Sequence, residues 1–266
     1  MMTLTFVVRV AAPQTVDRMT VSLTDPARPA TVEAGVVHGS ITLKGYEGKE
    51  VVVEARLRAV DAGMHEDKMK RIPVAATGLS VQERNNTVQI EAGASLNRIV
   101  DMTIIVPFRT SVNLTSSCDG DISVTGVEGD MEVGAAGGAV TLKNVAGNAV
   151  AHALKGRLLA QFDRVNSQKP MAFSSFSGDL DLTFPANLKA TLSISSNRGD
   201  VFTDFDVEMQ PSDAGQSVRS TKGADGKYRV EVDRSVRGTI NGGGQHIQLK
   251  TYSGRIYIRK AGGLAN

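Results

Sequence analysis

Pairs of apolar residues separated by one position recur along the chain, and between residues 118 and 164 they recur at a fixed interval. Five glycines stand nine residues apart, at Gly120, Gly129, Gly138, Gly147 and Gly156. Side chains two positions apart lie on the same face of a strand, so an apolar pair after each glycine predicts a short strand with one buried face. The residues two and four places after each glycine are all apolar: Ile122, Met131, Val140, Ala149 and Leu158, then Val124, Val133, Leu142, Ala151 and Ala160.

The glycine before each pair predicts a turn that needs positive φ, which glycine adopts at little cost. A turn and a strand repeated at a fixed period predict a stack of similar units, here a β-solenoid or β-roll. The turns alternate in kind, because a valine stands two residues before Gly129 and Gly147 but not before Gly120 and Gly138. The structural period is therefore 18 residues. Two strands per coil indicate a flattened roll, which this alternation favours over a three-sided helix.

The same unit recurs outside the regular ladder, at Gly39, Gly178, Gly199 and Gly254. β-Branched and alternating segments predict further strands at residues 51–57 and 98–107. Segments 79–82 and 87–90 are predicted to form a hairpin, because the paired asparagines between them tolerate a left-handed backbone. Segments 238–240 and 246–249 are predicted strands joined by the turn 241–245. Residues 4–10 also indicate a strand, 61–71 a loop or helical turn, and 210–227 a polar loop.

The chain is thus predicted to be all-β and to form one continuous domain. Residues 1–110 are the less regular N-terminal β portion of the solenoid, and residues 111–266 carry the glycine ladder.

Composition agrees with thin, closely stacked strands, since the chain has 27 glycines, no tryptophan and 5% aromatic residues. The net charge of +2 gives no indication of a nucleic-acid partner. No apolar run has the ~18 residues of a transmembrane helix. Segment 4–10 is a poor secretory signal because it is short and contains Arg9, so the protein stays in the cell or its export signal lies outside this sequence. The single cysteine, Cys118, is interpreted as a small apolar residue near a strand end.

Aspartates follow several repeat glycines, as in calcium-binding nonapeptide rolls. Those rolls need the carboxylate in register from coil to coil, whereas the ladder has Asp121, Asp130, Ala139, Asn148 and Arg157 at this position. Turn aspartates that bond to local backbone are the favoured interpretation, and no metal site is predicted. The integrin tripeptide Arg198-Gly199-Asp200 also coincides with a repeat glycine, so we interpret it as part of the repeat.

A polysaccharide-acting lyase or hydrolase is the catalytic alternative, since such chemistry uses paired carboxylates. Asp179 with Asp181, and Asp204 with Asp206, are spaced to share a strand face. The glycine-rich segment 241–245 lacks the Lys-Ser/Thr of a phosphate loop. The histidines are scattered and indicate neither a zinc site nor a catalytic triad: His38, His65, His152 and His246. No catalytic, cofactor-binding or metal-binding residue is therefore predicted, and no cofactor.

Several strings together resemble a bacterial β-strand-repeat family over roughly residues 20–260. Members of this domain family of unknown function carry the label "putative adhesin" and are akin to the head domain of auto-transporter adhesins. The strings are Gly39–Tyr46 with Gly48–Val51, the Ser/Thr-x-x-Gly-Asp units, Phe162–Val165, Asp204–Asp206 and Gly238–Gly244.

The resemblance implies a right-handed β-helix-like protein outside the cytoplasm, in the periplasm or at the cell surface, and it brings no catalytic residues. The predicted function is non-enzymatic: a cell-envelope or surface scaffold, adhesin-like, that binds a macromolecule, either protein or polysaccharide. The polysaccharide-acting enzyme remains the alternative.

Overall fold

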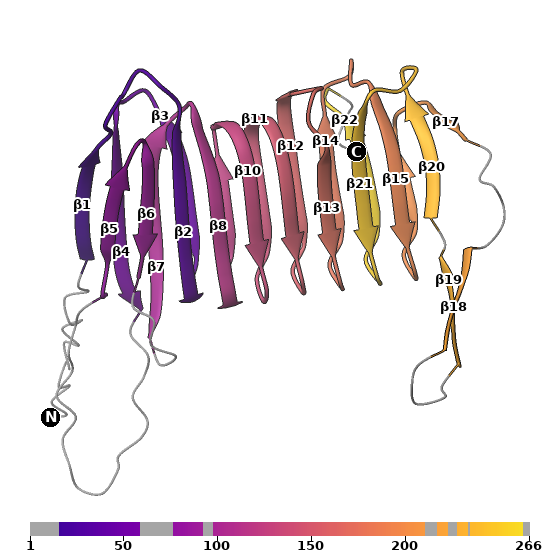
Figure 1. The fold of residues 1–266 in the computed structure, drawn as a ribbon, viewed down its shortest axis with the longest axis horizontal. Helices are drawn as coiled ribbons and strands as arrows, with labels where there is room; N and C mark the ends of the chain where they lie inside the picture. The colour runs from indigo at the N-terminus through magenta and orange to yellow at the C-terminus, as the bar shows by residue number, and fades with distance from the viewer. Residues whose placement is uncertain are drawn as a thin grey trace, which may run out of the picture.

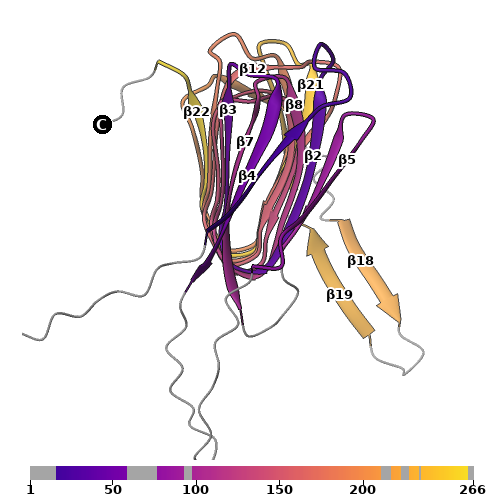
Figure 2. The same cartoon turned by 90° about the vertical axis from the view of Figure 1, so that its left-hand side faces the viewer.

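The computed structural model describes residues 16–58, 77–92, 98–210, 217–222, 228–233 and 235–262. Strands in this part of the chain form two layers that wind around one core as a flattened β-solenoid (Figures 1 and 2). Twenty strands belong to one hydrogen-bonded sheet, and β18 (Ser217–Lys222) pairs with β19 (Tyr228–Asp233) in a separate hairpin. The predicted all-β solenoid is confirmed.

The two layers, here called face A and face B, each run the length of the stack. Face A consists, in spatial order, of β1 (Val16–Ser22), β4 (Glu50–Arg58), β7 (Ile99–Pro107), β3 (Ile41–Tyr46), β9 (Ile122–Thr125), the first part of β11 (Val140–Ala153), β12 (Leu158–Val165), β14 (Leu180–Phe184), β22 (Ile256–Lys260) and β16 (Val201–Thr203). Face B consists of β5 (Ser80–Arg84), β6 (Thr87–Glu91), β2 (Ala30–His38), β8 (Thr110–Asp119), β10 (Glu128–Ala135), the second part of β11, β13 (Met171–Ser175), β21 (Gln245–Thr251), β15 (Ala190–Ser196), β20 (Ser235–Ile240) and β17 (Val207–Met209).

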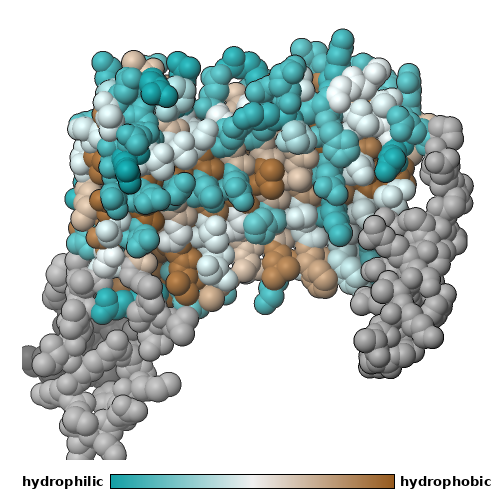
Figure 3. Space-filling view, in the orientation of Figure 1, coloured by the Kyte–Doolittle hydropathy of each residue, from teal (hydrophilic) through white to brown (hydrophobic). Residues whose placement is uncertain are grey.

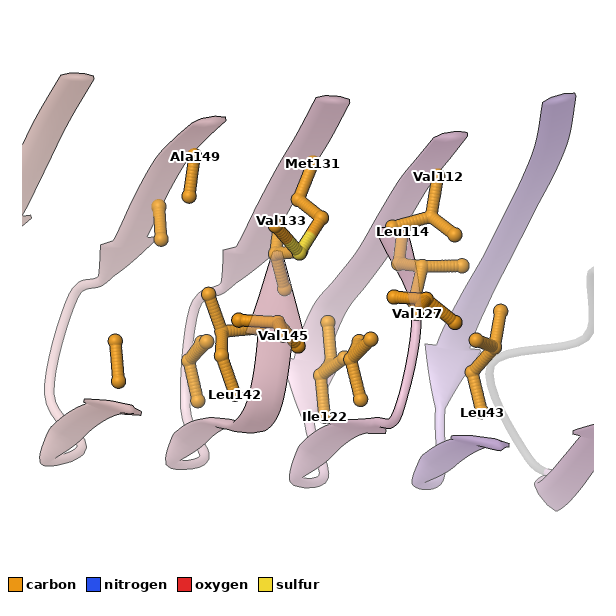
Figure 4. Close-up of a cluster of buried hydrophobic side chains, with 14 of the residues drawn as sticks. Leu43, Val112, Leu114, Ile122, Val127, Met131, Val133, Leu142, Val145 and Ala149 are labelled. Carbon is orange, nitrogen blue, oxygen red and sulfur yellow. The ribbon is translucent and has the colours of Figure 1, made fainter. Parts of the chain in front are cut away.

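The apolar pairs of the ladder line the interior between the two faces. All ten predicted core positions are at most 2% exposed. Figure 4 shows side chains such as Leu142 and Met131 pointing into the space between the layers. Val140 pairs in parallel with Ile122 on one side and with Leu158 on the other, so equivalent positions lie 18 residues apart. The two-sided coil inferred from the alternating turns is confirmed.

The repeat glycines are required mainly by close approach of neighbouring coils. Gly120 and Gly147 have positive φ (133° and 114°), but Gly129, Gly138 and Gly156 do not, so the φ argument was wrong for these three. A Cβ atom on Gly138 would lie 2.1 Å from the carbonyl oxygen of Gly120, and one on Gly156 would lie 2.0 Å from that of Gly138. Only a residue without a Cβ permits this spacing.

Tight turns of this kind line one long edge of the stack, the lower edge in Figure 1. We call it the glycine-turn edge. The units that lie outside the regular ladder also belong to the glycine-turn edge, as predicted, because a Cβ atom added to each of their glycines would meet the backbone of the preceding coil. In stack order its glycines are Gly39, Gly120, Gly138, Gly156, Gly178, Gly254 and Gly199. Gly129 and Gly147 lie on the opposite edge, the corner edge, where β11 bends from one face to the other.

The coils do not follow one another in chain order, which the spacing alone does not reveal. Strands β2 and β3 lie between β6 and β7 on one side and β8 and β9 on the other. The last coil, β21 and β22, lies between β13 and β14 on one side and β15 and β16 on the other. Where β21 begins, the buried side chain of Gln245 donates to the carbonyl oxygen of Lys169 (2.6 Å). The winding is therefore not continuous along the sequence.

The predicted hairpin of β5 and β6 is confirmed, with Asn85 and Asn86 at φ of 55° and 64°. The carboxylate of Glu83 accepts hydrogen bonds from the backbone N–H of Thr24 (3.1 Å), the backbone N–H of Asn86 (2.8 Å) and the Thr24 hydroxyl (2.9 Å). These hydrogen bonds lower the pKa of Glu83 below its ordinary value, and the bond from the Thr24 backbone has the largest effect. They fasten the hairpin to the segment before β2.

Acid should therefore weaken this attachment. Because the folded pKa of Glu83 is lowered, its stabilising contribution is present above the unfolded pKa of about 4.3 and is lost as pH falls through the folded value. We expect Glu83→Gln to be less stable than the native chain at pH 6 and to show a shallower fall in urea midpoint between pH 5 and 3. Equal pH slopes for the two proteins would contradict this assignment.

Two predictions about the less regular segments have different outcomes. Residues 217–222 were expected in a polar loop, but they form strand β18, because β19 offers a partner ladder over six residue pairs. The strand predicted at 4–10 and the loop or turn at 61–71, which contains His65, lie outside the described residues.

Candidate binding surface

Exposed apolar side chains gather at the glycine-turn edge, on three consecutive coils. Leu154, Phe176 and Tyr252 stand two residues before their repeat glycines and are 49%, 53% and 37% exposed. The rings of Phe176 and Tyr252 are stacked, with centroids 4.8 Å apart and planes 1° from parallel. This distance equals the spacing of neighbouring strands, so equivalent positions on adjacent coils meet directly. The guanidinium of Arg198 lies over the Tyr252 ring at 5.2 Å.

A second aromatic pair lies on face A at the last two coils. Phe202 stacks on Tyr257 with centroids 5.2 Å apart, and the guanidinium of Arg259 lies 5.0 Å from the centre of the Tyr257 ring. Both aromatics stand three residues after a repeat glycine, where the side chain points outward. Phe202 is 48% exposed. Aromatic side chains thus reach the surface on both sides of the glycine turns, at one end of the stack.

Asp181, one of the carboxylates considered for catalysis, is held between two arginines. Its side chain is 10% exposed, pairs with Arg157, and accepts from Nε of Arg259 at 2.7 Å. This hydrogen bond raises the pKa of Arg259 above its ordinary value. Asp179 accepts the backbone N–H of Arg255 (2.7 Å). The two carboxylates therefore engage different groups and do not converge on a shared substrate position.

The remaining aspartates bind mostly across coils. Asp121 accepts the backbone N–H of Ala139 (2.8 Å), one coil further along the stack. Asp130 pairs with Lys169 (2.6 Å) on the corner edge, and Asp204 accepts the backbone N–H of Lys260 (2.6 Å). The prediction that the turn aspartates bond to local backbone was thus wrong, because the backbone groups that Asp121 and Asp179 bind belong to a neighbouring coil. Asp121, Asp179 and Asp204 hold neighbouring coils together, because the strand beside them belongs to another coil.

Within the described residues no group of three or more metal-ligating side chains occurs. Among the histidines placed by the structure, His38 on β2, His152 on β11 and His246 on β21 lie on separate strands, and Nδ1 of His38 is 3.4 Å from Asp119. The turn predicted at 241–245 joins β20 to β21, with positive φ from Asn241 to Gly244. Gly199 of the integrin-like tripeptide belongs to the glycine-turn edge, where its Cβ would lie 1.8 Å from the Gly254 oxygen.

Outward side chains form rows in register across the whole stack, a feature that sequence analysis did not identify. Its signal is the residue three places after each glycine, which lies between the two buried positions. The row on face A consists of Arg18, Glu54, Thr103, Thr42, Ser123, Thr141, Leu159, Asp181, Tyr257 and Phe202. On face B, seen in Figure 3, polar surface dominates towards the corner edge and apolar patches appear lower down.

A groove of about 470 Å³ lies on the corner edge. Two ion pairs cross it, Arg164 with Glu128 (2.8 Å) and Lys169 with Asp130 (2.6 Å). All four side chains are more than half exposed. Its charges are thus largely neutralised within the groove, and exposed pairs of this kind contribute little stability.

A flattened, two-faced β-solenoid with stacked glycine turns is the architecture of this chain. The chain belongs to the family described as Toastrack DUF4097, whose model matches residues 19–259. The resemblance noted in the sequence is thereby confirmed. No helix among the described residues has the length and apolar character to cross a membrane.

Two solved structures are similar over most of their length. A putative cell adhesion protein from Clostridium sporogenes is 10% identical, with 93% of this chain and 100% of that chain covered and a TM-score of 0.49. A putative adhesin from Bacteroides fragilis is 12% identical, with 92% and 97% covered and a TM-score of 0.36. No curated protein matches the chain. At these identities and scores neither structure says what this chain binds.

Proposed function

We propose that this protein is a non-enzymatic scaffold of the cell envelope or cell surface that binds another macromolecule through its regular outer surface. The observation that carries the proposal is the register of the outward rows. In the row on face A, side chains of ten strands stand side by side. A polymeric ligand meets such a surface at many equivalent points, so weak contacts add up along the stack. The location outside the cytoplasm rests on the family resemblance.

The exposed aromatics support binding rather than catalysis. Phe176, Tyr252 and Phe202 expose large apolar surface at one end of the stack, and such surface is typical of recognition sites. The carboxylates that a glycosidase or lyase needs are engaged elsewhere, because Asp181 is paired with two arginines and Asp179 with backbone.

A polysaccharide panel tests this proposal. The native chain is incubated with acidic and neutral polysaccharides, and new reducing ends and unsaturated products are measured. We expect none from the native chain, from Asp179→Asn or from Asp181→Asn. Turnover by the native chain that either substitution abolishes would overturn the scaffold function and establish the enzyme.

A further inference from the structure

The two ends of the stack are finished differently. At the N-terminal end, antiparallel strands close both faces: β4 and β1 on face A, and β5 on face B. At the other end, antiparallel β20 and β17 close face B. On face A, β16 pairs in parallel with β22 and, among the described strands, with no other. Face A thus ends on a strand that continues the coil and lacks an antiparallel closing strand.

The inward-facing residues of β16 are exposed at this end of the stack. Val201 and Thr203 pair with Ile256 and Ile258, which are at most 1% exposed. The side chains of Val201 and Thr203 therefore point inward, in register with these buried isoleucines. Val201 is nevertheless 42% exposed, and Thr203 is exposed too. Phe202, on the outward side, is 48% exposed. An inward valine is this open because no further coil covers it within the described residues.

The backbone of β16 also offers hydrogen-bonding groups at the open edge. Ile256 N–H donates to the Asp200 carbonyl oxygen (3.0 Å), and Asp204 N–H donates to that of Ile258 (3.3 Å). In a parallel ladder alternate residues face the partner strand, so Asp200, Phe202 and Asp204 face β22. The N–H and C=O groups of Val201 and Thr203 therefore face away from it, in the geometry that accepts another strand.

The charge around β16 indicates which kind of strand could be added to this edge. Residues 197–210, which run from the glycine turn of the terminal coil through β16 and β17, carry one arginine against three aspartates and one glutamate, a formal net charge of −3. Asp200 and Asp206 are exposed and border the open strand. A second copy presenting the same end brings like charges together, whereas a strand with basic residues at its flanks is complementary.

We propose that β16 binds an extended peptide segment of a partner protein, apolar at its centre and basic at its flanks, as an added strand of face A. The inference rests on the proposed binding function and names its partner class. Valine-like side chains of the segment pack against the inward-facing side chains of Val201 and Thr203. Its basic residues lie beside the carboxylates of the terminal coil. The alternative is that β16 is an edge strand protected from pairing, since short strands and charged flanks also prevent the addition of another strand.

A designed peptide distinguishes the two. The probe is acetyl-Ser-Lys-Val-Phe-Val-Lys-Ser-amide, in which valines face inward and lysines outward in either strand direction. The matched controls are the same peptide with glutamate for lysine and the same peptide methylated at the backbone nitrogens from the first valine to the second lysine, which removes the ladder donors in both the parallel and the antiparallel direction. Binding is measured by titration, with amide NMR shifts followed at Val201 and Thr203.

We expect the lysine peptide to bind at least tenfold more tightly than either control. In the variant Asp200→Lys/Asp206→Lys, the preference for the lysine peptide over the glutamate peptide should reverse. The two replaced carboxylates make no hydrogen bond to another described residue. An unchanged melting temperature shows that this variant is folded. Equal affinity for the three peptides, no reversal, or no binding at millimolar peptide would overturn the proposal.

Self-association is the remaining outcome. Sedimentation of the native chain that shows a dimer, converted to monomer by Val201→Pro, would assign the edge to a second copy and so also overturn the peptide proposal. None of these failures affects the polysaccharide test, so failure of the peptide proposal leaves the scaffold function standing.

Discussion

Gly156→Ala is expected to destabilise the fold by about 3 kcal/mol, the upper end of the usual cost of overpacking, because the added group meets rigid backbone. The added Cβ would lie 2.0 Å from the carbonyl oxygen of Gly138 and 2.6 Å from the backbone nitrogen of Ala139. Both atoms belong to the neighbouring coil, so relief requires that two coils move apart at the glycine-turn edge. For a chain of this size the melting temperature should fall by roughly 10 °C.

Gly35→Ala is the matched control. Gly35 lies within β2, has no positive φ, and its Cβ would meet only the Thr115 carbonyl oxygen at 3.9 Å, an ordinary contact. We expect a change within about 0.5 kcal/mol. Both variants are compared by urea denaturation. Similar midpoints for the two would show that glycine is not required by the approach of neighbouring coils.

Removal of the last coil, by ending the chain at Gly244, is expected to unfold the C-terminal half of the stack. β21 and β22 bury Ile247, Leu249, Ile256 and Ile258, each at most 1% exposed. At about 1.5–3 kcal/mol for each side chain, their loss is of the order of the whole stability of a domain. The deletion also separates β13 from β15 and β14 from β16, which pair only through this coil.

Excision of the β18–β19 hairpin is the control for this truncation. These two strands pair only with each other among the described strands, and the chain on either side is already close, since Gln210 N–H donates to the Arg237 carbonyl oxygen (3.1 Å). Residues 211–234 replaced by a short Gly-Ser linker should leave the melting temperature within a few degrees of native. Hydrogen exchange then compares the two deletions. Protection of β13 to β15 that survives truncation would disprove the role of the last coil.

Local spacing predicted the repeating unit correctly, because the rule that places side chains on one strand face involves only near neighbours. All ten ladder positions are buried, and the units at Gly39, Gly178, Gly199 and Gly254 belong to the same edge. The reason for the glycines was less well predicted. Steric contact between Gly138 and Gly120 involves another coil, and a φ argument considers one residue at a time.

The candidate site was predicted only in part. Sequence analysis identified Asp179, Asp181 and Arg198 as residues to consider, but their partners, such as Arg259 for Asp181 and Tyr252 for Arg198, lie more than fifty residues away. The stacked pairs Phe176–Tyr252 and Phe202–Tyr257 join residues whose separation follows no fixed period. These contacts depend on which coils are neighbours, and that order is not the order of the chain.

The sequence by itself determined the strands, their buried faces and the two-sided coil, because alternation and the 18-residue period act through adjacent residues. Tertiary structure alone decided that the first and last coils insert into the stack and that face A ends on β16. The physical reason is that every coil offers a nearly equivalent apolar strand to its neighbours. Which strand fills each place is then settled by the packing of the whole stack, not by any local pattern.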